Sequence, residues 1–182
     1  MRESYESKEM MKRLIFLLSV LGVLVAVVSI FNYVTVGKPL SEVLESETRN
    51  SGINIRSHYK NYTQPSLLVI DVKMISGEKS AVDVFRVFLQ YAEKLKGKSF
   101  DSVLLQSKGV TKFVISGDYF KELGTEYGEQ NPVYTMRTFT EHVYSPDGIK
   151  AFSTWSGGLL GVLKEQMEDF GAFHKRWYVE DM

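Results

Sequence analysis

Cysteine is absent from all 182 residues of this chain. That absence excludes disulfides, thiolate metal sites, a cysteine nucleophile and the lipid-modified cysteine of a bacterial lipoprotein. The stability of any folded part must therefore come from its packed core alone.

An excess of charge is also lacking, because 22 basic residues balance 22 acidic ones. A chain without a positive surplus has no broad basic field to hold a polyanion, so nucleic-acid binding is not expected. With 44% hydrophobic and 13% aromatic residues, the composition is that of a packed globular protein and not of a disordered chain.

Familiar catalytic and metal-binding motifs are missing. His58, His142 and His174 stand in no arrangement from which a metal site can be argued, so no metal is expected. No nucleophile elbow, Walker loop or dinucleotide fingerprint is present, and no cofactor is predicted. Glu165 and Asp169 lie one helical turn apart, but on the expected solvent side of a helix. A solvated pair is the simpler interpretation there than an acid and base couple.

A long apolar run is the most prominent feature that is present. Residues 14–31 contain only two serines and one glycine besides hydrophobic side chains, and a looser apolar stretch continues to residue 36. At about 1.5 Å per helical residue, residues 14–36 reach roughly 34 Å, enough to cross a hydrocarbon core of about 30 Å. Because no polar stripe interrupts it, the run is predicted to be a transmembrane anchor and not a core helix.

A cleaved signal peptide is the alternative interpretation of the same run. Val27, Val28 and Ser29 offer small or β-branched side chains at the positions that a signal peptidase reads, and cleavage there would give a secreted protein. The apolar stretch continues past Ser29 into Ile30 and Phe31, which favours the uncleaved anchor. Both interpretations export the rest of the chain.

The flanking charges predict the orientation of the span. Basic residues precede it at Arg2, Lys8, Lys12 and Arg13 and follow it at Lys38, Arg49 and Arg56. This bias predicts a single-pass protein with residues 1–13 as a short cytoplasmic tail and an extracytoplasmic C-terminal domain. The compartment is then a periplasm, a cell surface or a lumen.

The part after the span is long enough for one domain of ordinary size. Gly37, Lys38 and Pro39 are expected to end the span, and Pro39 can open a short helix that runs to about Glu47. Residues 37–52 are therefore predicted to be a stalk or a first helix. Residues 53–182 are predicted to form one exported α+β domain.

Alternating side chains predict the strands of this domain. After an extended segment over residues 53–62 comes a clear strand, with Asp71 and Lys73 on one face. Its other face carries Leu68, Ile70, Val72 and Met74. This period of two is typical of a half-buried strand, which we expect to be central in the sheet. Residues 102–106 and 110–116 are predicted to form a hairpin.

Helical spacing marks two amphipathic helices. Ser80 and Asp83 are a helix-start signal for the first, and Gly97 supplies its stop. Its apolar stripe is Ala81, Phe85, Phe88, Ala92 and Leu95, and its expected solvent face is Asp83, Arg86, Gln90, Glu93 and Lys94. A final helix is predicted from after residue 158 to about Tyr178, packed across the sheet. Its apolar face is Leu159, Leu163, Met167, Phe170, Phe173 and Trp177.

The fold class predicted from these elements is α+β. We expect a mixed or antiparallel sheet of about four strands in ββαββ order, covered by helices and ending in the long amphipathic helix. Between residues 117 and 158 only two short helices are indicated, one near residues 118–123 and one that Asn131 caps, with Pro132 at its first position.

The segment 141–158 is the candidate ligand site, because it has few periodic apolar residues and yet carries several aromatic ones. Its candidate residues are His142, Tyr144, Trp155, Ser156, Gly157 and Gly158. The two glycines precede a helix, whose first amides can receive a carboxylate or a phosphate. The simpler interpretation is that the glycines make a sharp turn and the aromatic side chains close the open end of the domain.

Two classes of function follow. The leading hypothesis is a membrane-anchored envelope protein whose exported domain binds another protein of the same compartment, since catalytic motifs are missing. The alternative is an enzyme or a small-ligand receptor with an unfamiliar site in segment 141–158.

Overall fold

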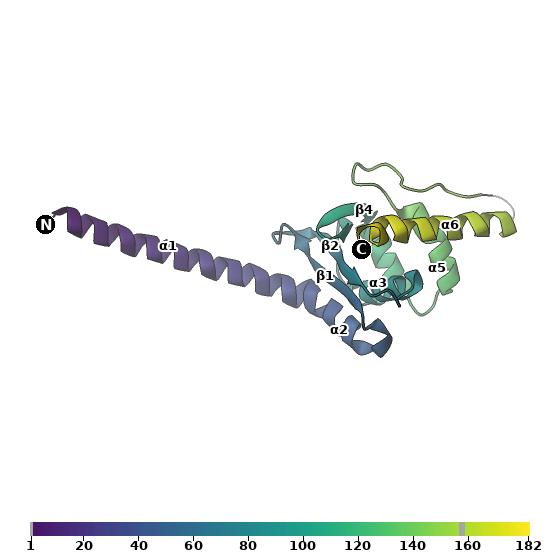
Figure 1. Ribbon diagram of the computed structural model, residues 1–182, viewed down its shortest axis with the longest axis horizontal. Helices are drawn as coiled ribbons and strands as arrows, with labels where there is room; N and C mark the ends of the chain where they lie inside the picture. Colours follow the sequence, from purple (N-terminus) through teal and green to yellow (C-terminus); the bar gives the residue numbers. More distant parts are fainter. Residues whose placement is uncertain (1, 157–158) are drawn as a thin grey trace.

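The computed structural model describes residues 2–156 and 159–182, with side chains over 10–156 and 161–182. It is an α+β protein with a four-stranded mixed sheet, as expected. One long N-terminal helix projects from the folded part, and the sheet lies between that helix and a layer of helices (Figure 1). The predicted site residues Gly157 and Gly158 lie outside the described residues.

The N-terminal helix runs into the folded domain without a break. α1 (Arg2–Asn32) continues through a π-helical turn, η1 (Tyr33–Gly37), into α2 (Lys38–Ser46). In the π-helical turn the Lys38 amide donates to the carbonyl oxygen of Tyr33. Pro39 then occupies the first turn of α2, where its missing N–H is tolerated. Residues 37–39, where the sequence predicts the end of the span, are thus helical, and the short helix predicted to run to about residue 47 is present as α2.

Met10–Ser46 is the one helix, within the part of the chain that the structure describes, that is long and apolar enough to cross a membrane. The side chains of its most apolar stretch are not covered by any part of the domain. Farther along, Val36, Leu40 and Val43 are buried in the core. The continuous helix Met10–Ser46, called the rod below, therefore has an uncovered N-terminal part and a C-terminal part that packs in the core.

The sheet is built from β1 (Ile53–Lys60), β2 (Gln64–Ile75), β3 (Ser102–Ser107) and β4 (Val110–Ser116) in the spatial order β1-β2-β3-β4. The pairs β1–β2 and β3–β4 are antiparallel, while β2 and β3 are parallel. The parallel pair requires a crossover, which α3 (Ala81–Leu95) supplies. β2 is central, as its apolar pattern predicts.

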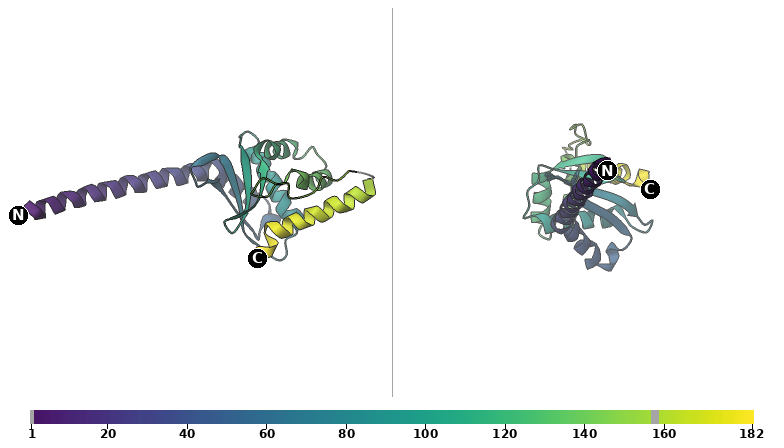
Figure 2. Two further views of the ribbon diagram at one scale, coloured as in Figure 1. Left: turned by 90° about the horizontal axis from the view of Figure 1, so that it is seen from above. Right: turned by 90° about the vertical axis from the view of Figure 1, so that its left-hand side faces the viewer.

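The two faces of the sheet differ in character. Leu68, Ile70 and Val72 of β2 point into the core, as predicted. Met74 does not continue that face, because a register shift beside Asn54 and Ile55 places an extra residue in β2 and leaves Met74 56% exposed. The face that points away from the core is not covered by the helical layer, and it lies on the side from which α1 leaves (Figure 2).

α3 begins with the predicted cap: the Ser80 hydroxyl accepts from the amide of Asp83, whose carboxylate accepts from the amide of Ser80. Phe85 and Phe88 are buried on the predicted stripe. The expected solvent face is partly wrong, because α2 and its following turn η2 (Thr48–Asn50) pack beside α3. Arg86 therefore meets protein groups instead of water alone.

α4 (Gly117–Glu126), α5 (Pro132–Phe139) and the short η3 (Thr140–His142) follow the sheet. Asn131 caps α5, since its side-chain oxygen accepts from the Val133 amide at 2.9 Å. α4 approaches α3 very closely at Gly124, where a Cβ atom would lie 2.3 Å from the carbonyl oxygen of Ala92. Only glycine fits there, so this residue sets the spacing between the two helices.

α6 (Leu159–Trp177) and η4 (Val179–Asp181) end the chain. Phe170, Phe173 and Trp177 are buried as predicted, and the Trp177 indole donates to the carbonyl oxygen of Gln106 in β3 at 3.0 Å. Met167 is 36% exposed, because the N-terminal half of α6 extends beyond the sheet (Figure 2). Among the described side chains of the predicted apolar face, those in the C-terminal half are buried, while Leu163 is half-buried and Met167 is exposed.

Candidate functional site

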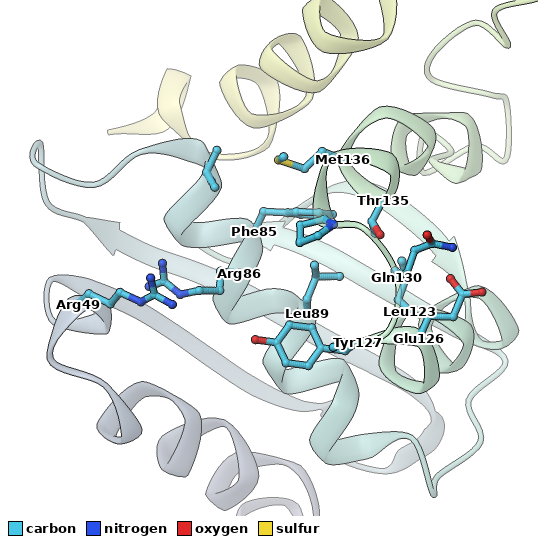
Figure 3. A pocket seen from close by; sticks show the side chains of 13 residues that line it. Arg49, Phe85, Arg86, Leu89, Leu123, Glu126, Tyr127, Gln130, Thr135 and Met136 are labelled. Carbon is cyan, nitrogen blue, oxygen red and sulfur yellow. The ribbon is translucent and has the colours of Figure 1, made fainter. Parts of the chain in front are cut away.

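A groove of about 390 Å³ opens between α3, α4 and α5 on the helical side of the domain (Figure 3). Phe85 and Leu89 of α3, Leu123 of α4 and Met136 of α5 give it an apolar lining. Phe85, Leu89 and Leu123 also belong to the hydrophobic core, so the groove reaches down to the core surface. Its volume falls at the lower end of the range of ligand pockets.

Side chains of opposite charge line the two ends of the groove, and the two arginines are each paired with a carboxylate, Arg49 with Glu47 and Arg86 with Asp83. Arg49 and Arg86 lie side by side at one end, while Glu126 and Gln130 lie at the other, with Tyr127 on the wall between them (Figure 3). A cationic end, an apolar middle and an acidic end make a directional lining. Such a groove distinguishes the two ends of whatever occupies it.

Arg86 is held rigidly at the cationic end. One terminal nitrogen of its guanidinium donates to Asp83 at 2.8 Å, and the other donates to the side-chain oxygen of Asn50 at 2.7 Å. Its Nε is buried and has no hydrogen-bond partner among the described residues. These two hydrogen bonds fix the position of the guanidinium at this end of the groove.

The turn η2 is tied to α3 by a network of polar side chains. The buried Asn50 amide donates to the carbonyl oxygen of Val43 at 2.7 Å, and Gln90 donates to the carboxylate of Glu47 at 2.6 Å. Hydrogen bonds from Arg49 and Gln90 lower the pKa of the Glu47 carboxyl. These contacts fix Arg49 and Arg86 relative to each other, although the two residues are far apart in sequence.

Asp83 forms an ion pair with Arg86 beside the groove. Hydrogen bonds from Ser80 and then from Arg86 lower its pKa to about 2. The carboxylate therefore stays charged at neutral pH and keeps the Arg86 guanidinium in place. The same residue caps α3, so the cap and the groove depend on one side chain.

The residues predicted from segment 141–158 do not converge on one point. His142 is exposed and stacks on Tyr119 with ring centroids 3.9 Å apart. The backbone of Tyr144 pairs with Val114 at the free edge of β4. Trp155 donates its indole N–H to Asp169 of α6 at 2.7 Å. Of the remaining predicted site residues, Ser156 is exposed.

None of the described residues among these predictions lines the groove, and the sequence predicts no site from the residues that do. The sequence places Arg86 on a solvent face and Arg49 among the basic residues after the span. The sequence signal that could have indicated the groove is the pair of short helices before and after residue 128, because both need an apolar surface such as α3 to pack against. Periodicity alone does not show which helices leave a gap between them.

The described lining of the groove contains no serine, histidine, cysteine or lysine, and the hydroxyl of Thr135 is within bonding distance of the carbonyl oxygen of Asn131. Within residues 2–156 and 159–182, no group of three or more histidine, cysteine, aspartate or glutamate side chains is placed to hold a metal ion.

The fold and the groove together define a class: an α+β domain with a directional groove, joined rigidly to one uncovered apolar helix. Comparison with family models, with curated proteins and with solved structures gave no match.

Proposed function

We propose that this chain is a single-pass membrane protein whose α+β domain stands outside the cytoplasm and binds another protein of the same compartment through the groove between α3, α4 and α5. The observation that carries the proposal is the groove itself, with its apolar middle and oppositely charged ends. The apolar helix supplies the attachment.

The uncovered surface of α1 supports the membrane attachment. Large apolar side chains such as Leu17, Leu21 and Val25 are each more than half exposed, which is unfavourable in water. The helix also runs unbroken through Val27 and Ser29 into η1 and α2, whose residues Val36, Leu40 and Val43 are buried in the domain. Both features favour an anchor that stays attached to the domain.

The chemistry of the groove supports a peptide segment of a protein as its occupant. An apolar side chain of the partner fits the middle, where Phe85, Leu89 and Met136 can cover it. An acidic group on one side of that residue meets Arg49 and Arg86, and a basic group on the other side meets Glu126. A segment with the order acidic, apolar, basic therefore matches the groove in one direction.

The partner is tested by photocrosslinking in native membranes. Val82, which is 50% exposed on the rim of the groove, and Val110, which is 58% exposed in β4, give a matched pair of positions. A benzoylphenylalanine at residue 82 should give one discrete adduct that residue 110 does not give. Arg49→Gln should weaken the adduct, and Lys94→Gln on the exposed side of α3 should not. Equal adducts from both positions, or indifference to Arg49, would refute the groove as the binding site.

The attachment has its own test, independent of the groove. The full-length protein should remain in the membrane pellet after carbonate washing and require detergent for release. Protease added from outside should remove the domain and leave a small protected fragment. Recovery in the soluble fraction, or a mature N-terminus at Ile30, would contradict the anchor.

A further inference from the structure

The turn between β1 and β2 lies against the apolar helix. This hairpin tip, residues 61–63, flanks a hollow of about 410 Å³ whose other wall is formed by Leu24, Val25, Val28 and Ser29 of α1. The strands of a water-facing domain thus reach down beside a helix surface that is apolar on every side. Because the hollow opens onto this apolar helix surface, a lipid acyl chain is the group that fits it best.

Asn32 fixes the hairpin tip in this place. Its side-chain nitrogen donates to the carbonyl oxygens of Val28 and of Tyr62, at 2.9 and 2.8 Å. Its side-chain oxygen accepts from the amide of Tyr59 at 2.8 Å. Asn32 is only 3% exposed, so water does not compete for these bonds. The tip cannot swing away from α1 without breaking them.

The backbone of the hairpin tip is in an unusual conformation. Asn61 and Tyr62 have φ values of 52° and 61°, a region that L side chains rarely adopt. Tyr62 is held there by its bond to Asn32 and by stacking on His58, with ring centroids 4.5 Å apart. The ring is nevertheless 51% exposed. A strained turn that presents a tyrosine outward points to a use for that ring.

The depth of the hairpin tip follows from helix geometry. If the hydrocarbon core begins at Leu14, about 30 Å at 1.5 Å per residue brings its far edge near Tyr33. Val28 then lies about 8 Å below that edge, within the depth that interfacial elements reach. Tyr33 and Tyr62 are both more than half exposed at this level, where tyrosine is favoured. Lys60 is exposed at the end of β1, and at this depth its ammonium group would be in reach of lipid phosphates.

We propose that the hairpin tip inserts into the phospholipid interface on the domain side of the membrane, with Tyr62 as the inserted side chain and Asn32 as the group that holds it there. This inference rests on the membrane attachment proposed above. It makes the domain a body that sits on the bilayer at two points, α1 and the tip, and not one that moves freely on a stalk.

The absence of cysteine makes the test direct, because single cysteines label without background. Thr63→Cys marks the tip and Leu21→Cys marks the middle of the apolar helix. The exposed Ser153→Cys marks the loop before α6, which lies on the side of the domain away from α1 (Figures 1 and 2). Each full-length variant is labelled with the environment-sensitive dye NBD in nanodiscs of phosphatidylcholine and phosphatidylglycerol. Quenching is measured with doxyl lipids labelled either near the headgroup or near the end of the acyl chain.

The tip label should shift its emission to the blue and lose most of its fluorescence with the shallow quencher but not with the deep one. The label at residue 21 should respond to the deep quencher, and the label at residue 153 to neither. If residue 63 behaves like residue 153 while residue 21 is quenched, the tip is not inserted although the anchor stands. If residue 21 is not quenched either, the anchor and the tip insertion both fall.

Discussion

The backbone amide of Tyr59 donates a 2.8 Å hydrogen bond to the side-chain oxygen of Asn32, which precedes it by 27 positions. This bond joins the last turn of the apolar helix to the first strand of the sheet. Asn32→Ala would leave the Tyr59 amide and the Tyr62 carbonyl without their partner. We expect it to lower the free energy of unfolding by about 1–3 kcal/mol, the cost of unpaired buried polar groups.

This loss is measured by guanidinium denaturation in detergent, followed by tryptophan fluorescence. Ser29→Ala is the control, because the Ser29 hydroxyl bonds only to the Val25 carbonyl one turn earlier in the same helix. It should leave the midpoint nearly unchanged. Equal midpoints for the two variants would show that Asn32 does not tie the helix to the hairpin.

Phe88 tests the core beneath α3. Its ring lies 5.6 Å from that of Phe120 and 5.7 Å from that of Phe139, and only 2% of it is exposed. Phe88→Ala should cost about 3–5 kcal/mol, the usual cost of emptying a buried aromatic site. Glu93→Ala, on the outer side of the same helix, should change the denaturation midpoint little. Similar losses from both variants would contradict the packing of α3.

Substitution by alanine should change stability in opposite directions at Gly124 and at Gly171. A methyl group at residue 124 meets the backbone of Ala92, so Gly124→Ala should destabilise the domain by about 1–3 kcal/mol through overpacking. At residue 171, in α6, nothing lies within 4 Å of the added Cβ. Gly171→Ala should therefore stabilise the domain by about 1 kcal/mol, the helix-propensity difference. Thermal unfolding separates the two, and a stabilising Gly124→Ala would rule out the close contact between α3 and α4.

His174 predicts a pH dependence of stability. The side chain is 2% exposed among aromatic rings, and burial lowers its pKa to about 3. In the unfolded chain its pKa is near 6.5, so below that pH the unfolded state binds a proton that the folded state excludes. Stability should fall between about pH 6.5 and pH 3, by about 1.4 kcal/mol per pH unit from this residue.

His174→Phe isolates that contribution, because the other two histidines, His58 and His142, are present in both proteins. The variant should lose less stability on acidification than the wild type over this pH interval, as measured by denaturation midpoints. Parallel curves for the two proteins would mean that His174 is protonated in the folded state.

Substitution of Trp155 tests whether segment 141–158 is a ligand site or closes the open end of the domain. Its indole bonds to Asp169, and nearby Phe152 packs against Phe113 and Phe173 of the core. Trp155→Phe should cost about 1 kcal/mol, and its effect should not add to that of Asp169→Ala. If the stability losses of Trp155→Phe and Asp169→Ala add up in the double variant, the hydrogen bond between the two residues does not contribute to stability. Unchanged stability of Trp155→Phe together with loss of function would favour the ligand site.

Local signals in the sequence predicted most of the elements. The Ser80 cap, the Asn131 cap and the alternation from Leu68 to Val72 each involve residues a few positions apart, so the sequence carries them directly. Met74 was misplaced, because a register shift depends on the partner strand and not on β2 alone.

Features that join distant segments were not predictable in this way. Asn32 was counted as part of an apolar stretch, and its three hydrogen bonds become visible only when β1 and β2 are in place. The groove needs three helices and a turn from separate parts of the chain. Gly124 carries no sequence sign that another helix crosses it.

The unbroken passage from α1 through η1 into α2 leaves the domain no swivel. In a bilayer, both the height of the groove above the lipid and its bearing around the helix axis are then set by the rod. If the proposed attachment holds and the partner is anchored in the same membrane, the two proteins meet by lateral diffusion and rotation about the helix axis, with the groove at a constant height. A flexible linker inserted after residue 32 would let the domain reach farther from the helix, but the groove would no longer have a fixed height and orientation.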